Sequence, residues 1–270
     1  MIDKIPKEPY SKGMNIGLIG YGKMGKMVEA AALAKGHSIS LVVDPLAACE
    51  KASSGTALLK ALPDKNGIAG TDICIEFTGP ASAPDNIKAV AALGKPVVSG
   101  STGWHGNLPD VTEAVKKADA SLLWSSNFSL GVNLFYRIIA HAAIMADPFE
   151  EYDLGGLEIH HNKKADSPSG TAKVLMERVL PVMKRKTKVL WDTPEGALNK
   201  DTVHFASIRY GSVPGTHSLF FDSPADTIEI THTARSREGF ASGALQAAIW
   251  LASKKQSGVF TFEDMLKEIL

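Results

Sequence analysis

The densest group of reactive side chains in the 270-residue sequence lies near its middle, in the run HHNKKADSPSGT at residues 160–171. It combines two imidazoles, two ammonium groups, one carboxylate and three hydroxyls. Such a run can be a solvated loop, because loops are usually polar, or it can hold a metal ion. It can also bind a small anion and protonate it, because imidazole titrates near neutral pH. The neighbouring residues favour the third interpretation.

A metal site in this run would need ligands at the spacings that metal-binding motifs show. Asp166 and the remaining histidines do not match such a spacing. On an extended strand, His160 and His161 would point to opposite sides and would not serve one site equally. Lys163 and Lys164 would also repel a cation. We therefore expect no bound metal.

An anion site is favoured by the residues that close the run, SPSGTA, which lead into a predicted helix at residues 170–186. Ser169 can cap that helix, and the first backbone N–H groups, at Gly170 and Thr171, would have no partner inside it. A helix N-terminus of this kind binds carboxylates. Lys164 adds a positive charge, and a histidine nearby can supply a proton. The segment therefore predicts a site that holds a small dicarboxylate and protonates it during a reduction.

A second candidate site is the glycine loop GYGKMG, which follows a predicted strand at residues 14–19 and precedes a predicted helix at residues 23–35. Gly20, Gly22 and Gly25 have the G-x-G-x-x-G spacing. Between a strand and a helix, this spacing allows a tight turn, a close approach of the backbone to a pyrophosphate, and phosphate binding at the helix N-terminus. We therefore expect a dinucleotide here.

The dinucleotide is expected to be NADH, with NADPH tolerated. Asp44 ends the second predicted strand, where a carboxylate accepts hydrogen bonds from ribose hydroxyls and repels a 2′-phosphate. Pro45 follows it where an arginine would favour NADPH, although Lys23 in the glycine loop offers that phosphate a cation. Three further segments end successive predicted strands and outline a groove for the nicotinamide ribose and carboxamide. They are Phe77 and Thr78, then Gly100, Ser101 and Thr102, and then Ser125, Ser126, Asn127 and Phe128.

The hydrophobic pattern of the first half supplies the elements that would position the glycine loop. Apolar, β-rich runs alternate there with helical patterns, which predicts right-handed βαβ units and a doubly wound parallel sheet. The expected strands are residues 14–19, 38–43, 72–77, 95–99 and 120–124, and the expected helices are 23–35, 84–93 and 108–118.

The pattern changes after residue 127. A long apolar helix is expected at 130–145, and extended segments at 152–160, 204–209, 216–221 and 227–233. These predict an α+β domain with an open mixed sheet that is largely antiparallel. A last helix, at 240–252, is expected to return to the first domain. The predicted fold class is thus α/β. We expect a Rossmann dinucleotide-binding domain at 1–127, completed by 238–270, and a substrate-binding domain at 128–237. The site is expected in a cleft between them.

The bulk composition excludes several classes of function. Lys+Arg and Asp+Glu number 29 each, so no net charge would attract nucleic acid or an anionic membrane. Cys49 and Cys74 lie among apolar neighbours and are expected to be buried and inert. No apolar run reaches the roughly 20 residues that span a bilayer, and MIDKIPKEPYSKG lacks the apolar region of a signal peptide. We expect a cytoplasmic protein whose first dozen residues form a flexible extension.

The sequence also resembles the dihydrodipicolinate reductase (4-hydroxy-tetrahydrodipicolinate reductase) family of bacterial and plant lysine and diaminopimelate synthesis. EIHHNKKADSPSGTA is similar to the family signature, and the resemblance extends from about residue 14 onward. Further blocks occur in the family's order: GLIGYGKMG, GSTGW, SSNFSLGVN, IRYGSVPGTHSLFF and ITHTARSREGFASGA. The chain departs from the family pattern in three places. Ser167 stands where alanine is usual, and no arginine follows Asp44. The glycine loop is shorter and has Lys23 in place of a common arginine.

This resemblance implies NAD(P)H-dependent reduction of 4-hydroxy-tetrahydrodipicolinate to tetrahydrodipicolinate, and a second domain that builds a homotetramer through its sheet. It implies that His160 donates or accepts a proton and that Lys164 is a second proton donor, whereas Lys163 falls at a variable position and receives no role. The residues implied to hold the substrate carboxylates are His161, Ser169, Gly170 and Thr171. Those implied to line the cofactor are the strand-end residues named above, with Asp44, Gly20, Tyr21, Gly22, Lys23, Met24 and Gly25.

Two other functions fit parts of the sequence. Another two-domain Rossmann oxidoreductase, acting on a different small carboxylate or sugar, would share the first half, but its catalytic lysine typically lies on a strand of the nucleotide domain. A regulator that senses the NADH/NAD ratio would need the glycine loop but would not need His160 and Lys164.

Overall fold

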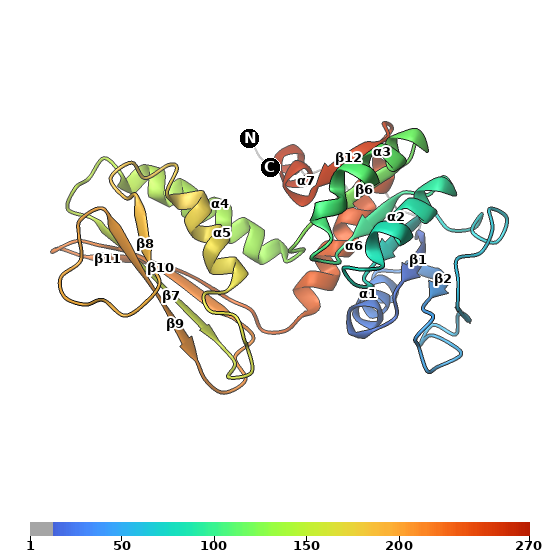
Figure 1. Cartoon of the computed structure of the whole chain (residues 1–270), viewed down its shortest axis with the longest axis horizontal. Helices are drawn as coiled ribbons and strands as arrows, with labels where there is room; N and C mark the ends of the chain where they lie inside the picture. Colours follow the sequence, from blue (N-terminus) through green and yellow to red (C-terminus); the bar gives the residue numbers. More distant parts are fainter. Residues whose placement is uncertain (1–12) are drawn as a thin grey trace. The chain divides into compact units, whose positions relative to one another are not determined.

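The computed structural model describes residues 13–270, which form two compact units (Figure 1). One unit contains residues 13–129 together with Glu238–Leu270, and the other contains Leu130–Arg237. The flexible extension predicted at the N-terminus falls on residues 1–12 and lies outside the described residues.

The first unit is built on a seven-stranded sheet with the order β12-β6-β5-β4-β1-β2-β3. Every strand pair in it is parallel. The strands are β1 (Asn15–Ile19), β2 (Ser38–Val43), β3 (Leu58–Leu59), β4 (Ile73–Glu76), β5 (Val97–Ser99), β6 (Ser121–Trp124) and β12 (Gly258–Thr261). The predicted α/β class with a parallel Rossmann-type sheet is therefore confirmed.

Helices cover both faces of this sheet, which is why its central strands are short and apolar. On one face, α1 packs against α6, and α6 also contacts β4, β5 and β6 although it comes from near the end of the sequence. On the other face, α2 packs against α3. The helices of the unit are α1 (Lys23–Ala34), α2 (Ala83–Ala92), α3 (Leu108–Lys117), α6 (Glu238–Ser253), α7 (Phe262–Ile269) and the 3₁₀ turn η1 (His105–Asn107).

The order of the strands reverses at β1. The chain runs from β1 to β2 and β3 on one side, and then crosses to β4, β5 and β6 on the other. Open α/β sheets bind ligands at the carboxyl ends of the strands beside such a reversal. The backbone N–H of Phe77 donates to the carbonyl of Ile19 at 2.8 Å, and that of Gly100 donates to Glu76 at 2.9 Å. The glycine loop and the predicted strand-end segments therefore share one edge of the sheet.

Four elements of this unit, β3, η1, β12 and α7, were not predicted. The sequence carried a usable signal for α7, because the Thr261 side chain accepts from the Asp264 backbone N–H while Asp264 accepts from that of Thr261. This reciprocal pair is a capping box. No such signal marks β3, whose two residues pair with the end of β2.

The second unit contains a five-stranded sheet with the order β11-β10-β7-β9-β8. Its strands are β7 (Asp153–His160), β8 (Lys188–Leu190), β9 (Thr202–Arg209), β10 (Thr216–Asp222) and β11 (Thr227–Thr233). The pairs β7–β10 and β10–β11 are antiparallel, and β7–β9 and β8–β9 are parallel. The mixed sheet is confirmed, but the expectation of a largely antiparallel one was wrong, because α5 makes a crossover between β7 and β9 and so permits parallel pairing.

Two helices, α4 (Leu130–Ala146) and α5 (Gly170–Val179), lie on one face of this sheet (Figure 1). They cover the apolar side chains of alternate strand residues, among them Leu154, Phe205 and Leu219. The helix predicted to run to residue 186 ends at Val179 instead. Pro181 lies two residues further on and has no backbone N–H to donate to the carbonyl four residues earlier, so the helical hydrogen-bond pattern stops there.

The opposite face of the same sheet is less buried. Strand alternation places Leu157, Ile159, Ile208 and Phe220 there. All four are half-buried or exposed, with Ile208 at 44%. Below we refer to this side as the open face.

The two cysteines differ, and one prediction about them was wrong. Cys74 is buried in β4, and burial raises the pKa of its thiol to about 12. Cys49 is exposed, because it lies in the irregular segment between β2 and β3 and not within a strand.

Among the described residues, none of the helices combines the length and the apolar character that crossing a bilayer requires.

Candidate active site

The carboxyl end of β7 carries the polar cluster that the sequence pointed to. Glu158 and His160 are both buried and lie on the helix-covered side of the sheet. The strand register places His217 of β10 opposite Glu158, and Arg209 of β9 opposite His160. The apolar core thus gives way to a cluster of polar side chains at one end of the sheet, and β7, β9 and β10 all contribute to it.

Glu158 is the centre of this cluster and is completely buried. Its Oε1 atom accepts hydrogen bonds from Arg209 Nη2 at 2.6 Å, Ser207 Oγ at 2.8 Å and the Ser169 backbone N–H at 3.0 Å. Burial raises the pKa of the Glu158 carboxyl, but the nearby His217 ring and hydrogen bonds from Ser169, Arg209 and Ser207 together outweigh it and leave that pKa well below its usual range. Glu158 is therefore a fixed negative charge.

His160 lies beside this charge. Its Nδ1 atom is 3.6 Å from Glu158 Oε2, and its ring meets that of His217 edge to face, with centroids 5.1 Å apart. Burial lowers the pKa of His160 to about 4, opposed by the Glu158 carboxylate and assisted by His217, Lys164 and Arg209. Without a bound anion, the imidazole is therefore neutral near pH 7.

The N-terminus of α5 adjoins the same cluster. Ser169 caps the helix by accepting a hydrogen bond from the Ala172 backbone N–H at 3.1 Å, and its hydroxyl lies 3.1 Å from His217 Nε2. Both polar groups of Ser169 are thus engaged within the protein. Gly170 is exposed, and a Cβ added to it would meet nothing within 4 Å. The open space at the predicted anion site therefore lies beside Gly170 and Thr171, and Ser169 holds the helix end in place.

Lys164 lies in the loop after β7. Its Nζ atom is 2.8 Å from Asp166 Oδ1, and the Asp166 carbonyl accepts from Arg209 Nη2 at 3.0 Å. His161 leaves the strand, and its backbone N–H donates to the Val213 carbonyl at 2.8 Å. The structure therefore gathers His160, Lys164 and the α5 N-terminus in one unit.

A set of possible metal-binding atoms in this cluster was not predicted from the sequence. One ligand atom each from Glu158, His160 and His217 lies within 4.8 Å of the others. Arg209 already neutralises Glu158, and Lys164 adds a second positive charge beside His160, so a metal cation is disfavoured at this trio. Glu158 could have been predicted from the sequence, because it lies two residues before His160 and therefore on the same face of the strand. His217 and Arg209 could not, because only the sheet register brings them to Glu158.

The glycine loop of the first unit fits a dinucleotide. Gly20 has a φ of +93°, and a Cβ on it would lie 2.4 Å from the Phe77 carbonyl oxygen. A Cβ on Gly25 would lie 2.2 Å from the Gly20 carbonyl oxygen, whereas one on Gly22 would meet nothing within 4 Å. The first and third glycines therefore allow close packing, and the second leaves open space at the N-terminus of α1, whose first turn carries no acidic residue. Lys23 and Met24 begin that helix, and Lys23 is exposed.

Asp44 follows β2 and is tied to the glycine loop. Its Oδ2 atom accepts from the Tyr21 backbone N–H at 2.7 Å, and its Oδ1 atom accepts from that of Leu46 at 2.8 Å. The Tyr21 side chain is buried, and its hydroxyl donates to Glu29 and accepts from the Ser53 backbone N–H. Tyr21 thus anchors the loop, and Asp44 keeps a carboxylate at the end of the strand.

The first two strand-end segments are joined by a residue that we did not predict, Glu76. It is completely buried, and its Oε1 atom accepts from the Thr78 backbone N–H and from the Ser101 hydroxyl, each at 2.7 Å. Gly100 packs under the Phe77 ring so closely that a Cβ would lie 2.1 Å from it. The predicted groove residues at the ends of β4 and β5 are therefore held together by a buried carboxylate.

The third segment, at the end of β6, packs through an aromatic contact and a local turn. The Phe128 ring lies edge to face with that of Phe77, 6.3 Å away. The Asn127 backbone N–H donates to Ser125 Oγ at 3.1 Å, whereas Ser126 and Thr102 are exposed. These contacts bring all three segments to the same edge as the glycine loop.

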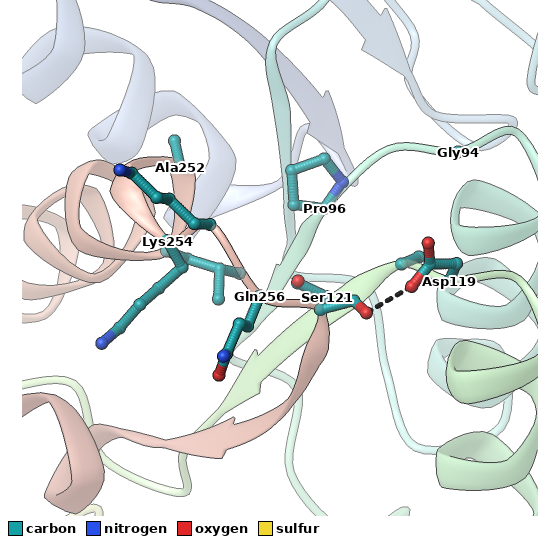
Figure 2. Close-up of a pocket in the computed structure, with 11 residues that line it drawn as sticks. Gly94, Pro96, Asp119, Ser121, Ala252, Lys254 and Gln256 are labelled. Carbon is teal, nitrogen blue, oxygen red and sulfur yellow. Dashed lines mark hydrogen bonds between the residues drawn. The ribbon is translucent and has the colours of Figure 1, made fainter.

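A separate pocket of about 550 Å³ lies in the same unit, lined in part by Gly94, Pro96, Ser121 and Lys254 (Figure 2). Gly94 and Pro96 precede β5, so this pocket is at the amino ends of the strands. The glycine loop is at the carboxyl ends. The pocket is therefore not the dinucleotide site.

Comparisons with known proteins agree with this geometry. The family model described as "Dihydrodipicolinate reductase, N-terminus" matches residues 14–128, and "Dihydrodipicolinate reductase, C-terminus" matches residues 131–266. A 4-hydroxy-tetrahydrodipicolinate reductase of Christiangramia forsetii is 37% identical over 95% of this chain and 99% of its own length. One from Desulfovibrio desulfuricans is 34% identical over 90% and 95%.

A solved structure, dipicolinate-bound dihydrodipicolinate reductase from Paenisporosarcina sp. TG-14, has the same fold. It superposes with a TM-score of 0.72 and 20% sequence identity, covering 96% of this chain and 100% of its own. A Rossmann sheet whose glycine loop fits a dinucleotide, together with a separate mixed-sheet unit, defines a pyridine-nucleotide-dependent oxidoreductase. More specifically, the chain belongs to the dihydrodipicolinate reductase family, which confirms the resemblance seen in the sequence.

Proposed function

We propose that this protein reduces 4-hydroxy-tetrahydrodipicolinate to tetrahydrodipicolinate in diaminopimelate and lysine synthesis, with NADH preferred and NADPH tolerated. The observation that carries the proposal is the junction of a buried imidazole, His160, with the open N-terminus of α5 at Gly170. The names of the curated relatives support this substrate, and so does the dipicolinate, a dicarboxylate, bound to the related reductase from Paenisporosarcina.

The substrate's carboxylates would be held at the N-terminus of α5. The backbone N–H groups of Gly170 and Thr171 have no partner within the helix, and the helix dipole favours an anion there. His161 and Lys164 add donors, and Ser169 supports the site by capping the helix. Ser169, which precedes Gly170, donates its backbone N–H to Glu158, so a carboxylate bound at this helix end would lie beside the cluster that contains His160.

The reduced nicotinamide, when bound, would supply a hydride to the substrate ring, after or along with loss of the 4-hydroxyl group as water. The resulting carbanion-like centre needs a proton, which His160 or Lys164 would deliver. Two negative carboxylates beside His160 favour its imidazolium form, because opposite charges at short range stabilise each other. The neutral imidazole would thus take up a proton with the substrate and release it from Nε2 during the reaction.

The cofactor would bind along the edge that carries Gly20, Gly22 and Gly25, with its adenosine ribose at Asp44. A carboxylate at that position favours a free 2′-hydroxyl over a 2′-phosphate, which supports the preference for NADH. In this proposal the first unit holds the cofactor and the second holds the substrate. The second also builds a homotetramer through its open face. A cytoplasmic location follows from the biosynthetic role.

The test is steady-state oxidation of NADH, and separately of NADPH, with substrate made in place by condensing pyruvate with aspartate semialdehyde. We expect oxidation that depends on both precursors and on the condensing enzyme, with NADH the faster cofactor. A protein that binds NADH but oxidises neither cofactor under these conditions would not be this reductase. That result would favour the NADH-sensing regulator or an oxidoreductase with another substrate.

A further inference from the structure

We propose that Glu158 is a positioning residue for His160, whose imidazole it orients and whose tautomer it selects. The proposal rests on the proposed function, because His160 has its proton-transfer role only there. The observation behind it is a juxtaposition on one strand face: the buried Glu158 carboxylate has one oxygen held by three donors and the other directed at two imidazoles.

The carboxylate cannot easily move. Oε1 is held by Arg209 from β9, by Ser207 from the same strand and by the backbone of Ser169 at the start of α5. Oε2 is buried and has no hydrogen-bond partner among the described residues, but it lies 3.6 Å from His160 Nδ1 and 3.4 Å from His217 Nε2. A buried acceptor without a partner is costly, so Oε2 favours any arrangement that brings an N–H group to it.

The carboxylate therefore selects a tautomer. An ionised carboxylate can only accept hydrogen bonds, so the neutral His160 ring is favoured with its proton on Nδ1 and a lone pair on Nε2. A slight ring rotation shortens the separation from Oε2, and such contacts commonly tighten when substrate binds. His160 Nε2 lies next to Gly215, where a Cβ would approach to 3.0 Å. Glycine thus keeps the neighbourhood of Nε2 clear, and Nε2 is the atom left to exchange a proton.

The carboxylate also balances the charges that face His160. His217 from β10, Arg209 from β9 and Lys164 from the following loop all disfavour the imidazolium, and Glu158 on its own strand favours it. Without the Glu158 charge, His160 would face three groups that oppose protonation. The imidazolium formed during turnover would then be harder to reach, although the substrate carboxylates and the glycine loop would be untouched.

The experiment compares the full-length protein with its Glu158→Gln variant, which keeps the shape of the side chain and removes its charge. We expect kcat to fall about 10- to 100-fold, on the scale of impaired general acid catalysis. The KM for substrate and the Kd for NADH should each stay within about threefold, because a group acting through His160 contributes little to ground-state binding. The alkaline limb of the kcat–pH profile, along which the His160 imidazolium loses its proton, should move to lower pH in the variant.

A ¹⁵N NMR spectrum of the histidine side chains provides a readout that a merely structural role would not move. In the unmodified protein, with the His160 signals identified by a His160→Asn variant, we expect protonated Nδ1 and unprotonated Nε2. Glu158→Gln should shift His160 toward the other tautomer. Glu177→Gln, the same chemical change at an exposed residue of α5, is the matched control and should leave kcat and the spectrum unchanged.

An Nε2-protonated His160 in the unmodified protein would overturn the proposal, even if the Glu158 variant did not fold. So would a Glu158→Gln variant with unchanged kcat and an unchanged His160 tautomer. Failure of the proposed function looks different: the unmodified protein itself would then show no reductase activity. The tautomer would still report whether Glu158 orients the ring.

Discussion

The backbone N–H of Ser169 donates a hydrogen bond to Glu158 Oε1 at 3.0 Å, which joins the cap of α5 to the carboxylate beside His160. Eleven positions separate the two residues in sequence. The same carboxylate therefore holds the helix end proposed to bind the substrate and faces the imidazole proposed to protonate it. The proposed anion binding and proton transfer would thus be coupled through one buried group.

Alanine at His160 or at Lys164 should lower turnover by about 100-fold or more, because each removes a proton donor. The Kd for NADH should be unchanged, since the glycine loop belongs to the other unit. Steady-state kinetics and a fluorescence titration with NADH measure the two quantities. Lys163→Ala is the matched control: Lys163 is exposed and adjacent to Lys164 but has no assigned role, so its turnover should stay within about twofold. Full turnover in both the His160 and Lys164 variants would remove the assignment.

Binding of dipicolinate should be accompanied by proton uptake. The pKa of His160 is about 4 without a ligand, so near pH 6 the ring is almost entirely neutral. Two carboxylates nearby raise that pKa, so the complex holds more protons, and the affinity should weaken as pH rises through this range. Calorimetry in two buffers of different ionisation enthalpy measures the uptake. The proton uptake should be lost in the His160→Gln variant. Equal binding enthalpies in both buffers for the unmodified protein would contradict the prediction.

Replacing Asp44 by Asn should shift cofactor use toward NADPH. The amide keeps an acceptor for the Tyr21 backbone N–H and loses the one for Leu46, but it no longer repels a 2′-phosphate. We expect the ratio of kcat/KM for NADPH to that for NADH to rise about 10-fold or more, the equivalent of roughly 1.4 kcal/mol. Glu113→Gln, an exposed acid-to-amide change on α3, should leave the ratio unchanged. The same ratio in both variants would mean that Asp44 does not select the cofactor.

Glu76→Gln should weaken cofactor binding by loosening two loops together. The amide cannot accept at both ends, so one donor among Thr78, Ser99 and Ser101 loses its partner. We expect a loss of about 1–3 kcal/mol in unfolding free energy and a Kd for NADH roughly 10-fold higher. Urea denaturation and NADH titration measure these effects. An unchanged Kd in a destabilised variant would show that Glu76 stabilises the unit without shaping the cofactor groove.

Ile208→Glu should break the proposed tetramer. Ile208 lies on the open face at 44% exposure, so a charge there costs the isolated unit little but opposes burial against a second copy. Analytical ultracentrifugation should show tetramers for the unmodified protein and smaller species for the variant. Leu33→Glu, at a similarly exposed residue of α1, serves as control and should remain tetrameric. A tetramer in both variants would place the interface elsewhere.

The sequence by itself determined those structural features that depend only on residues close together in the chain. Gly20, Gly22 and Gly25 predicted the dinucleotide loop because turn geometry and the start of a helix depend on adjacent residues. SPSGTA predicted the capped helix at Ser169 for the same reason. Alternating strands and helices predicted the parallel sheet, since a parallel pair needs a crossover between its strands. Pro181 is also a local signal, for the end of a helix, but it was not used to predict where α5 ends.

Tertiary structure alone decided the rest. His217 and Arg209 reach Glu158 through the register of β7 with β10 and β9, and a shift of one residue would turn each to the other face. Glu76 became a functional candidate only when parallel pairing placed Thr78 and Ser101 around it. The low pKa of His160 depends on burial and on charges from three other segments of the unit. Residue type and spacing specify which chemical groups are available, but burial and strand register determine which of them act together.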